Sequence, residues 1–526
     1  MKAAKTRREK GFAIVLTTLA LVSTLLIAGL GFDVGTLYLI RTKLQGAMDA
    51  AALATVRALA QNPNVNAAKT VGQEFLVANF PNGYWGAQPL ASMPVANAIT
   101  VSEIDANGNA GTPGTTATAK LVTVTAGVSA PLYFLRILGQ NTANISFTAQ
   151  ATRQGLLLML VLDASSSMGA HSFSGQTACQ WAQQDAQAFL GYPQFDPDID
   201  RIGAVSFATN TYTSPPIANF QSPAGTLNTS SQVYTDLGTF NCPGGNTNTS
   251  EGLQQGYNAI STFWAGATPS RANVIILMTD GAPNGWTSNW TTATLQAGSL
   301  CGPPAGGTLT GMVARWTPTE NGILSVAAAP ASKMNMAQTS AISTNGKCKF
   351  TTQNNTSYWY QDFATVPSVD IYGDVLYGAS TYIPQGATTI APPPNSSQAV
   401  NTAVPTNATP SSTSTTAPIG NSSTTTDWQF LDFSRNTADE TATRLRTDAT
   451  YRIAIYCIGL YGNVNAATDP WDVVDDTLLN RIANTSASQI YNPNQPVGVY
   501  VTTPDASQLS SAFAQIASAI VARLSK

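Results

Sequence analysis

Apolar residues follow one another without a charge from Phe12 to Phe32, directly after a segment rich in lysine and arginine. A helix of this length spans about 32 Å, enough for the hydrocarbon core of a bilayer. The pattern predicts a single transmembrane helix at 12–32 that is retained. A cleaved signal peptide is the alternative, but its apolar core is normally only ~7–15 residues long and ends in a small-x-small site.

The charges beside this helix predict its orientation. Residues 1–11 hold five of the 25 lysines and arginines in the chain. Because basic flanks stay in the cytoplasm, we expect 1–11 to form a cytoplasmic flank and everything after the helix to be exported. This predicts a single-pass protein of a bacterial inner membrane with its C-terminal bulk in the periplasm.

A small module with helix and strand patterns follows the membrane helix. The alanine-rich stretch 33–62 continues the helical pattern, whereas prolines break any long element in 63–97. Alternation of apolar and polar residues then predicts strands, with a short helical turn at 131–138. We therefore expect an α+β module over 33–153, with strands at 99–104, 120–126 and 144–153.

Strand-like and helix-like segments alternate from residue 154 to the end, which predicts an α/β domain with a mostly parallel sheet and helices on both faces. One long interruption at 282–434 separates two parts of this domain. Within it, 375–426 has no charged residue and is rich in Thr, Ser, Pro and Asn, so it is expected to be a low-complexity loop. The predicted strands are 156–163, 201–208, 273–279, 452–459 and 497–502, and the predicted helices are 177–190, 249–262, 436–447, 475–484 and 506–524.

Candidate ligands of a metal ion follow the first of these strands. Asp163, Ser165 and Ser167 stand two residues apart on the loop after the apolar run 156–162. In proteins with open α/β sheets, bound molecules and ions lie at the carboxyl ends of the strands. Two further segments add oxygen donors in chain order, Thr247 on a Gly/Asn-rich loop before a helix and Asp280 after the strand 273–279. A set of turns and helix caps without metal is the alternative.

These three segments resemble the metal-ion-dependent adhesion site of von Willebrand factor type A domains. The resemblance implies Ser165, Ser167 and Thr247 as direct ligands, with Asp163 and Asp280 acting mainly through water. Thr247 is preferred to Thr249 because it lies five residues before Gly252, as the ligand threonine of the family does before its helix glycine. The implied ion is Mg²⁺, or Mn²⁺ or Ca²⁺, and a carboxylate of a protein partner would complete its coordination.

The segment after the membrane helix carries a second motif, formed by Asp33, Gly35, Tyr38, Arg41, Leu44, Gln45, Asp49 and Leu53. This motif resembles the N-terminal module of Tad (tight adherence) pilus-assembly proteins. With the A domain behind it, the chain is similar to TadG-like members of that group. This implies a non-enzymatic, membrane-anchored pilus assembly or adhesion factor whose partner is a pilin or another pilus-machine component, and it leaves a homo-oligomer open.

Two other functions are weighed against this one. A periplasmic structural linker would have an A domain that does not use metal. A hydrolase or chelatase-type accessory domain would need a catalytic base or a nucleotide-binding partner, for which the sequence gives no motif. Nucleic acid is not an expected partner, because only 10% of residues are charged, the net charge is −3, and no basic run follows residue 10.

The five cysteines have no metal-ligand spacing, so zinc is not expected. Cys457 lies in an apolar strand and is expected to be a buried thiol. The other four allow three disulfide pairings, of which Cys179–Cys242 with Cys301–Cys348 is the one suggested by location along the chain.

Two features that could suggest a functional site are interpreted as ordinary surface. The segment Asp196–Asp200 begins like a calcium loop but lacks its glycine and its bidentate glutamate, so it is expected to be a solvated turn. His171, the only histidine, is expected to be an exposed loop residue.

Overall fold

A computed structural model describes residues 2–90, 98–222, 224–242, 244–290, 309–314, 334, 367–376, 425–461, 474–503 and 506–524. The chain divides into two compact units. The first comprises 1–112, 119–153 and 524–526, and the second comprises 113–118 and 154–523. Each is described by itself.

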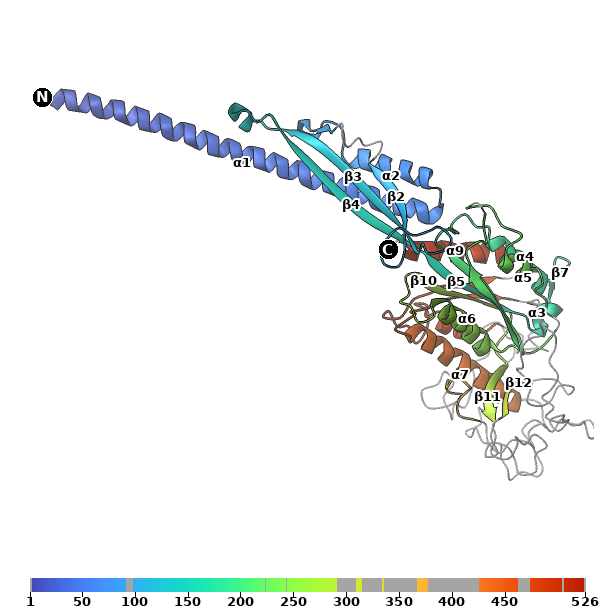
Figure 1. The fold of residues 1–526 in the computed structure, drawn as a ribbon. Coiled ribbons are helices and arrows are strands. Elements are labelled where there is room, and N and C mark those ends of the chain that lie inside the picture. The colour runs from blue at the N-terminus through green and yellow to red at the C-terminus, as the bar shows by residue number, and fades with distance from the viewer. Residues whose placement is uncertain are drawn as a thin grey trace, which may run out of the picture. The chain divides into compact units, whose positions relative to one another are not determined.

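One helix, α1 (Lys2–Gln61), begins unit 1 and continues well beyond the membrane segment (Figure 1). Its stretch from Phe12 is long and apolar enough to cross a membrane. The later half has an apolar stripe at helical spacing, including Ile40, Leu44 and Met48, that is buried against the rest of the unit. The predicted continuation of the helix over 33–62 is therefore present, and this later part is amphipathic.

A second helix and a sheet complete unit 1. Helix α2 (Val65–Asn79) fits between Pro63 and Pro81, so the prolines that were expected to break up 63–97 instead bound a helix there. The central strand β3 (Ala119–Pro131) pairs with its neighbours β1 (Gln88–Pro89), β2 (Ile99–Ile104) and β4 (Thr142–Gln154). Short 3₁₀ turns are η1 (Tyr84–Gly86) and η3 (Leu135–Leu138). The long β3–β4 hairpin runs beside α1 toward its N-terminal part (Figure 1).

The second unit is built on a six-stranded sheet with strand order β14-β13-β10-β5-β8-β9. All neighbouring pairs are parallel except β8 and β9. The predicted α/β fold with a mostly parallel sheet is confirmed. The strands are β5 (Leu156–Asp163), β8 (Arg201–Phe207), β9 (Thr211–Ile217), β10 (Ala272–Thr279), β13 (Ala454–Leu460) and β14 (Tyr500–Thr503).

Helices cover both faces of this sheet, and every residue of β5 is therefore buried (Figure 1). One face packs against α6 (Thr249–Trp264), α7 (Thr425–Thr447) and α8 (Asp476–Ile482). On the other face, α4 (Ala178–Phe189) meets α9 (Leu509–Leu524) through the rings of Phe189 and Phe513. Shorter elements are α3 (Ser166–Ala170), α5 (Gln232–Leu237), η5 (Ala506–Gln508), β6 (Ser172–Phe173) and β7 (Gln176–Thr177).

Strand β9 and helix α5 lie in a stretch for which the sequence predicted only loops. Pro215 and Pro216 obscure the strand pattern, but an edge strand tolerates proline because one side of its backbone pairs with nothing. The predicted turn at Asp196–Asp200 is present before β8, but the prediction that it is solvated is wrong. Both end carboxylates are buried, and Asp200 accepts hydrogen bonds from the backbone N–H groups of Leu156 and Asp196. The Asp200 carboxylate thus joins this turn to the first residue of β5.

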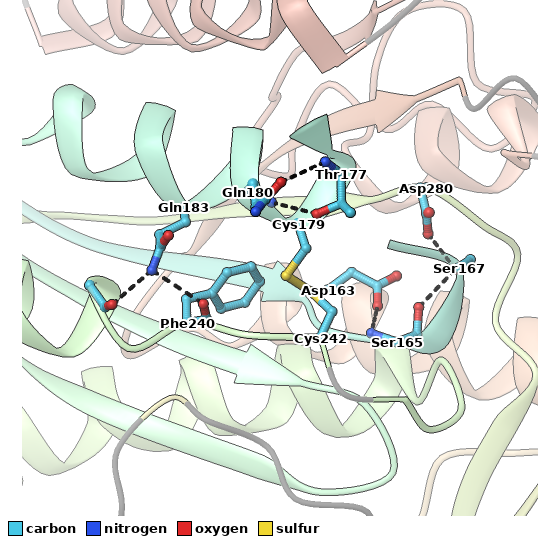
Figure 2. Close-up of a disulfide and its surroundings, with 11 residues drawn as sticks. Asp163, Ser165, Ser167, Thr177, Cys179, Gln180, Gln183, Phe240, Cys242 and Asp280 are labelled. Carbon is cyan, nitrogen blue, oxygen red and sulfur yellow. Dashed lines mark hydrogen bonds between the residues drawn. A yellow bond between two sulfur atoms is a disulfide. The ribbon is translucent and has the colours of Figure 1, made fainter. Parts of the chain in front are cut away.

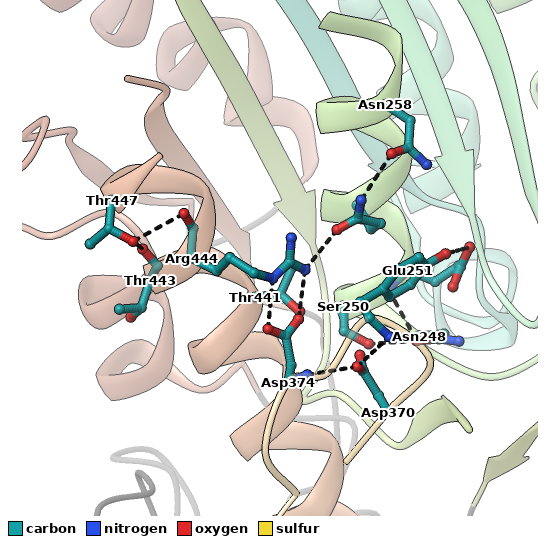
Figure 3. A network of polar contacts seen from close by, with 12 residues as sticks. Asn248, Ser250, Glu251, Asn258, Asp370, Asp374, Thr441, Thr443, Arg444 and Thr447 are labelled. Atoms are coloured by element: carbon teal, nitrogen blue, oxygen red, sulfur yellow. Dashed lines mark hydrogen bonds and ion pairs between the residues drawn. The ribbon is translucent and has the colours of Figure 1, made fainter. Parts of the chain in front are cut away.

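Only parts of the predicted 282–434 insertion are described. It begins with the hairpin β11 (Gly285–Trp290) and β12 (Leu309–Ala314). The segment 367–376 is held on α7 by Asp374, which pairs with Arg444 at 2.7 Å and accepts from Thr441 (Figure 3). Helix α7 begins at Thr425, ahead of its predicted start at 436. Cys301, Cys348 and most of 375–426 lie outside the described residues.

Candidate functional site

Two adjacent parallel strands bring the predicted carboxylates to one edge of the sheet. Leu162 of β5 is in register with Met278 of β10. Asp163 ends β5 and Asp280 comes directly after β10, so both lie at the carboxyl ends of neighbouring central strands. Both side chains are fully buried. This is the edge at which the sequence predicted a site.

Hydroxyl groups connect these two aspartates (Figure 2). Asp163 Oδ1 accepts from the backbone N–H of Ser165 at 2.8 Å. The Oγ atoms of Ser165 and Ser167 lie 3.0 Å apart, and Ser167 donates to Asp280 Oδ1 at 2.7 Å. Four of the five predicted residues thus form one hydrogen-bonded chain.

Thr247, the fifth predicted residue, reaches the same edge through its loop. The carbonyl of Gly245 accepts from the backbone N–H of Ser166 at 3.2 Å, which joins the loop to the one after β5. Asn284, just after β10, accepts from the Thr247 N–H at 2.6 Å and donates its own N–H to the Thr247 carbonyl at 3.1 Å. Sequence reasoning missed Asn284, whose signal is its place four residues after Asp280.

Close helix packing fixes the position of the Thr247 loop. A Cβ at Gly252 would lie only 2.7 Å from ring carbons of Phe207, so glycine lets α6 approach β8 directly. Asn248 caps α6 by accepting from the Glu251 N–H, and its amide donates to Thr287 of β11 at 3.0 Å. The spacing between Thr247 and Gly252 therefore has a packing reason that is independent of any metal.

A disulfide joins Cys179 at the start of α4 to Cys242, shortly before the Thr247 loop (Figure 2). This pairing is the one suggested by location, and it is confirmed. The carbonyl of Cys242 lies against Gly169, where a Cβ would approach it to 2.7 Å. The bond thus holds the loop beside α3, which contains the candidate ligand Ser167. Cys457 is a buried free thiol, as expected, and burial raises its pKa.

Asp163 and Asp280 bring two like charges close together in a buried site. Burial, and then the nearby carboxylate of Asp280, raise the pKa of Asp163 to about 7, although hydrogen bonds from Thr279 and Ser165 act in the opposite direction. The Thr279 hydroxyl donates to Asp163 Oδ2 at 2.6 Å. Like charges in a buried site favour uptake of a proton or a cation.

His171 is a part of this site that the sequence interpretation missed. Its Nδ1 lies 3.0 Å from Asp280 Oδ2, and only 11% of its side chain is exposed, so the prediction of an exposed loop residue is wrong. The short helix α3 explains the difference, because it places position 171 one turn after Ser167. The i, i+4 spacing from a candidate ligand was the available signal.

The donor set fits a hard divalent cation. Carboxylate and hydroxyl oxygens are the ligands that Mg²⁺ and Ca²⁺ prefer. Among the described residues, no group of three or more His, Cys, Asp and Glu side chains is arranged to hold a metal. Any ion at this edge therefore depends on the serine and threonine hydroxyls.

Two family models match the chain in the predicted order. Residues 11–58 match a model of Flp pilus-assembly TadE/G-like proteins. Residues 158–358 match the von Willebrand factor type A domain. The chain therefore contains a TadE/G-like Flp pilus-assembly segment followed by a von Willebrand factor type A domain. The second match ends before α7, β13, α8 and β14, which nevertheless contribute two strands to the same sheet.

Solved structures give more distant likenesses. The PilB minor pilin from Streptococcus sanguinis is 13% identical, with 81% of this chain and 79% of that chain covered and a TM-score of 0.34. The von Willebrand factor domain of the type V pili tip protein Mfa5 from Porphyromonas gingivalis is 16% identical, with 70% and 96% covered and a TM-score of 0.31. No curated protein matches the sequence significantly.

Proposed function

We propose that this protein is a membrane-anchored pilus assembly or adhesion factor whose A domain binds a protein partner through a divalent metal ion. The observation that carries the proposal is the buried chain Asp163–Ser165–Ser167–Asp280, which places two carboxylates at one sheet edge, where a cation would offset their like charges. Mg²⁺, Mn²⁺ or Ca²⁺ would be held by Ser165, Ser167 and Thr247, with Asp163 and Asp280 behind them.

A carboxylate from the partner is the expected incoming group. A cation held mainly by neutral hydroxyls keeps much of its charge, and an acidic side chain is the strongest protein group that completes its shell. The partner would be a pilin or another pilus-machine component. This role requires binding and release, not catalysis.

The orientation of the anchor is also proposed. The basic flank at 1–11 favours a cytoplasmic N-terminus and a periplasmic A domain. A reporter fused after Lys526 should be active only if it works in the periplasm. Activity of a cytoplasm-only reporter at that position would contradict this orientation.

Calorimetry on the full-length protein in detergent tests the metal site. Wild type should bind Mg²⁺ or Mn²⁺, and Ser167→Ala should bind it far more weakly. Ser172→Ala is the matched control, since Ser172 is exposed and lies outside the hydrogen-bonded chain. Binding of a purified pilin should then require the metal and disappear with a chelator. Equal metal affinity in wild type and Ser167→Ala would show that the site is misassigned.

A structural linker that does not use metal is the second candidate. The contact between His171 and Asp280 favours it, because the imidazole gives one carboxylate oxygen a partner inside the protein. Absence of divalent-metal binding by wild type, together with pilin binding that a chelator leaves unchanged, would support the linker.

A further inference from the structure

The loop that connects β3 and β4 in unit 1, residues 132–141, has a composition and a position that the proposed function does not use. We call it the tip loop. It contains η3 and lies beside α1 at the end of the long hairpin (Figure 1). Its contacts with α1 fall at residues 29–33, the last turn of the predicted membrane span.

Asp33 holds the tip loop on α1. Its carboxylate accepts from three successive backbone N–H groups, those of Tyr133 at 2.8 Å, Phe134 at 3.0 Å and Leu135 at 2.7 Å. These amides open η3, where N–H groups have no partner within the helix. The side chain of Asp33 is fully buried by this contact. The position of the loop along α1 is therefore fixed by a charge-assisted clamp.

Aromatic packing fixes the same contact. Phe32 meets the rings of Tyr133 and Phe134 edge-on, with centroids 5.7 and 5.8 Å away. A Cβ added to Gly29 would lie 2.4 Å from the Phe134 ring, so only glycine allows the ring to lie against the helix. The Tyr133 hydroxyl in turn donates to the carbonyl of Trp85 in η1.

The outer surface of the tip loop is apolar and exposed. Ile137 is 71% and Leu138 68% exposed, and the rings of Tyr133, Phe134 and Trp85 are also exposed. Arg136 stands between these residues and is exposed as well. Isolated exposed apolar residues are common, but a cluster with aromatic residues and a cation beside a membrane helix has the composition of a bilayer interface.

We propose that the tip loop inserts into the lipid leaflet at the Phe32 end of the helix and acts as a second membrane contact. The clamp fixes the loop at the end of the apolar span, so its apolar surface continues the lipid-facing surface of α1. Ile137 and Leu138 would enter the acyl region, Trp85 and Tyr133 would lie at headgroup level, and Arg136 would meet lipid phosphates. The consequence is a fixed tilt of the exported module on the membrane.

Collision measurements on a spin label test this. The label is attached to Ile137→Cys in full-length protein whose Cys301 and Cys348 are replaced by serine. The Cys179–Cys242 disulfide and the buried Cys457 do not react. In nanodiscs of phosphatidylethanolamine and phosphatidylglycerol, the ratio of oxygen to nickel-chelate collisions should be severalfold higher at 137 than at Asn107→Cys. Position 107 lies in the turn at the opposite end of β3.

Substitutions at two glycines of α1, one against the tip loop and one with open space around it, provide a test of this contact and its control. Gly29→Leu should displace Phe134 and lower the ratio at 137 toward that at 107. Gly31→Leu, which has open space around it, should leave the ratio unchanged. Carbonate extraction checks that both variants remain in the membrane. Equal ratios at 137 and 107 would overturn the proposal, as would protection of the 137 label from both reagents, because protein would then cover the loop.

Discussion

Two buried aspartates, Asp33 in unit 1 and Asp163 in unit 2, have opposite electrostatic surroundings. Burial would raise the pKa of Asp33, but three backbone N–H donors outweigh it and hold the pKa below its ordinary value. Asp163 has one backbone donor, one hydroxyl donor and the like charge of Asp280, and its pKa is raised to about 7. A carboxylate satisfied by the fold itself has a structural role, whereas one left short of positive charge is available to an external cation.

The second arrangement needs a rigid frame, because two like charges repel. In unit 2 the frame is the central sheet, the close contact of Gly252 with Phe207, and the Cys179–Cys242 disulfide. Unit 1 holds Asp33 with no disulfide among its described residues.

Removal of the disulfide should have the largest effect. Its sequence separation of 63 residues implies about 4 kcal/mol of stabilisation in the chain-entropy model. Cys179→Ser with Cys242→Ser should lower the denaturant midpoint of unit 2 and weaken metal binding. Reductant should reproduce the loss in wild type and leave the double variant unchanged. A double variant as stable as wild type would show that the loops are fixed without the bond.

Asp163→Asn should separate stability from binding. The raised pKa means that the native state holds this proton where the unfolded chain has lost it. This difference in proton binding stabilises the native state fully below pH 4, near the pKa of Asp163 in the unfolded chain. The stabilisation is lost as the pH rises through about 7. At pH 8 without metal, the neutral amide should therefore stabilise the protein by about 1–2 kcal/mol, while metal affinity falls roughly 10- to 100-fold.

Thermal denaturation with and without Mg²⁺ measures both effects of Asp163→Asn. Asp33→Asn provides the contrast, because loss of that charge should destabilise unit 1 instead. If both substitutions destabilise the metal-free protein at pH 8, the two aspartates do not differ in the way proposed.

Asp33→Ala should release the tip loop. Three N–H donors would lose their acceptor, which costs roughly 2 kcal/mol of local protection, or about thirtyfold in exchange rate. Hydrogen exchange of full-length protein in nanodiscs should show this at residues 133–135. Asp105→Ala, which removes the cap of the turn at the other end of the sheet, should leave these amides unchanged. Unchanged hydrogen exchange at residues 133–135 in Asp33→Ala would mean that the Asp33 carboxylate does not stabilise the tip loop.

The sequence was sufficient for the parts of the fold that have strong periodic patterns. The apolar runs of β5 and β10 and the alternation after residue 154 predict the parallel sheet, and sheet geometry then predicts that Asp163 and Asp280 meet. Strand β9 could not be predicted from pattern alone, because its two prolines are tolerated only at a sheet edge, which is a property of the assembled fold.

Long-range polar contacts were the other part that sequence could not supply. His171, Asn284 and Asp33 act on residues that are 109, 37 and about 100 positions away, and a local pattern does not reveal such partners. Asp196 and Asp200 were misjudged for the same reason. The buried role of Asp200 depends on the backbone N–H of Leu156, which the fold brings beside it.

Metal affinity should depend on pH. A metal ion and a proton compete for the Asp163–Asp280 pair, so affinity should be constant above pH 7 and fall by about tenfold per pH unit below it. Calorimetry between pH 5.5 and 8.5 measures this, with buffer ionisation corrected. Asp163→Asn should flatten the dependence along with lowering the affinity. A wild-type affinity that is constant down to pH 5.5 would contradict the raised pKa of Asp163.

His171→Ala should have the smallest effect, and its direction decides what the histidine does. The imidazole occupies Asp280 Oδ2, while Ser167 donates to Oδ1, so neither oxygen of Asp280 is free in the described site. If His171 competes with the ion, its removal should raise metal affinity about threefold, a fraction of the cost of one charge-assisted hydrogen bond. His171→Gln, which keeps a donor near Asp280, should restore wild-type affinity in calorimetry. A tenfold loss in His171→Ala would instead mean that the imidazole orients Asp280 toward the metal, as residues behind the ligands commonly do.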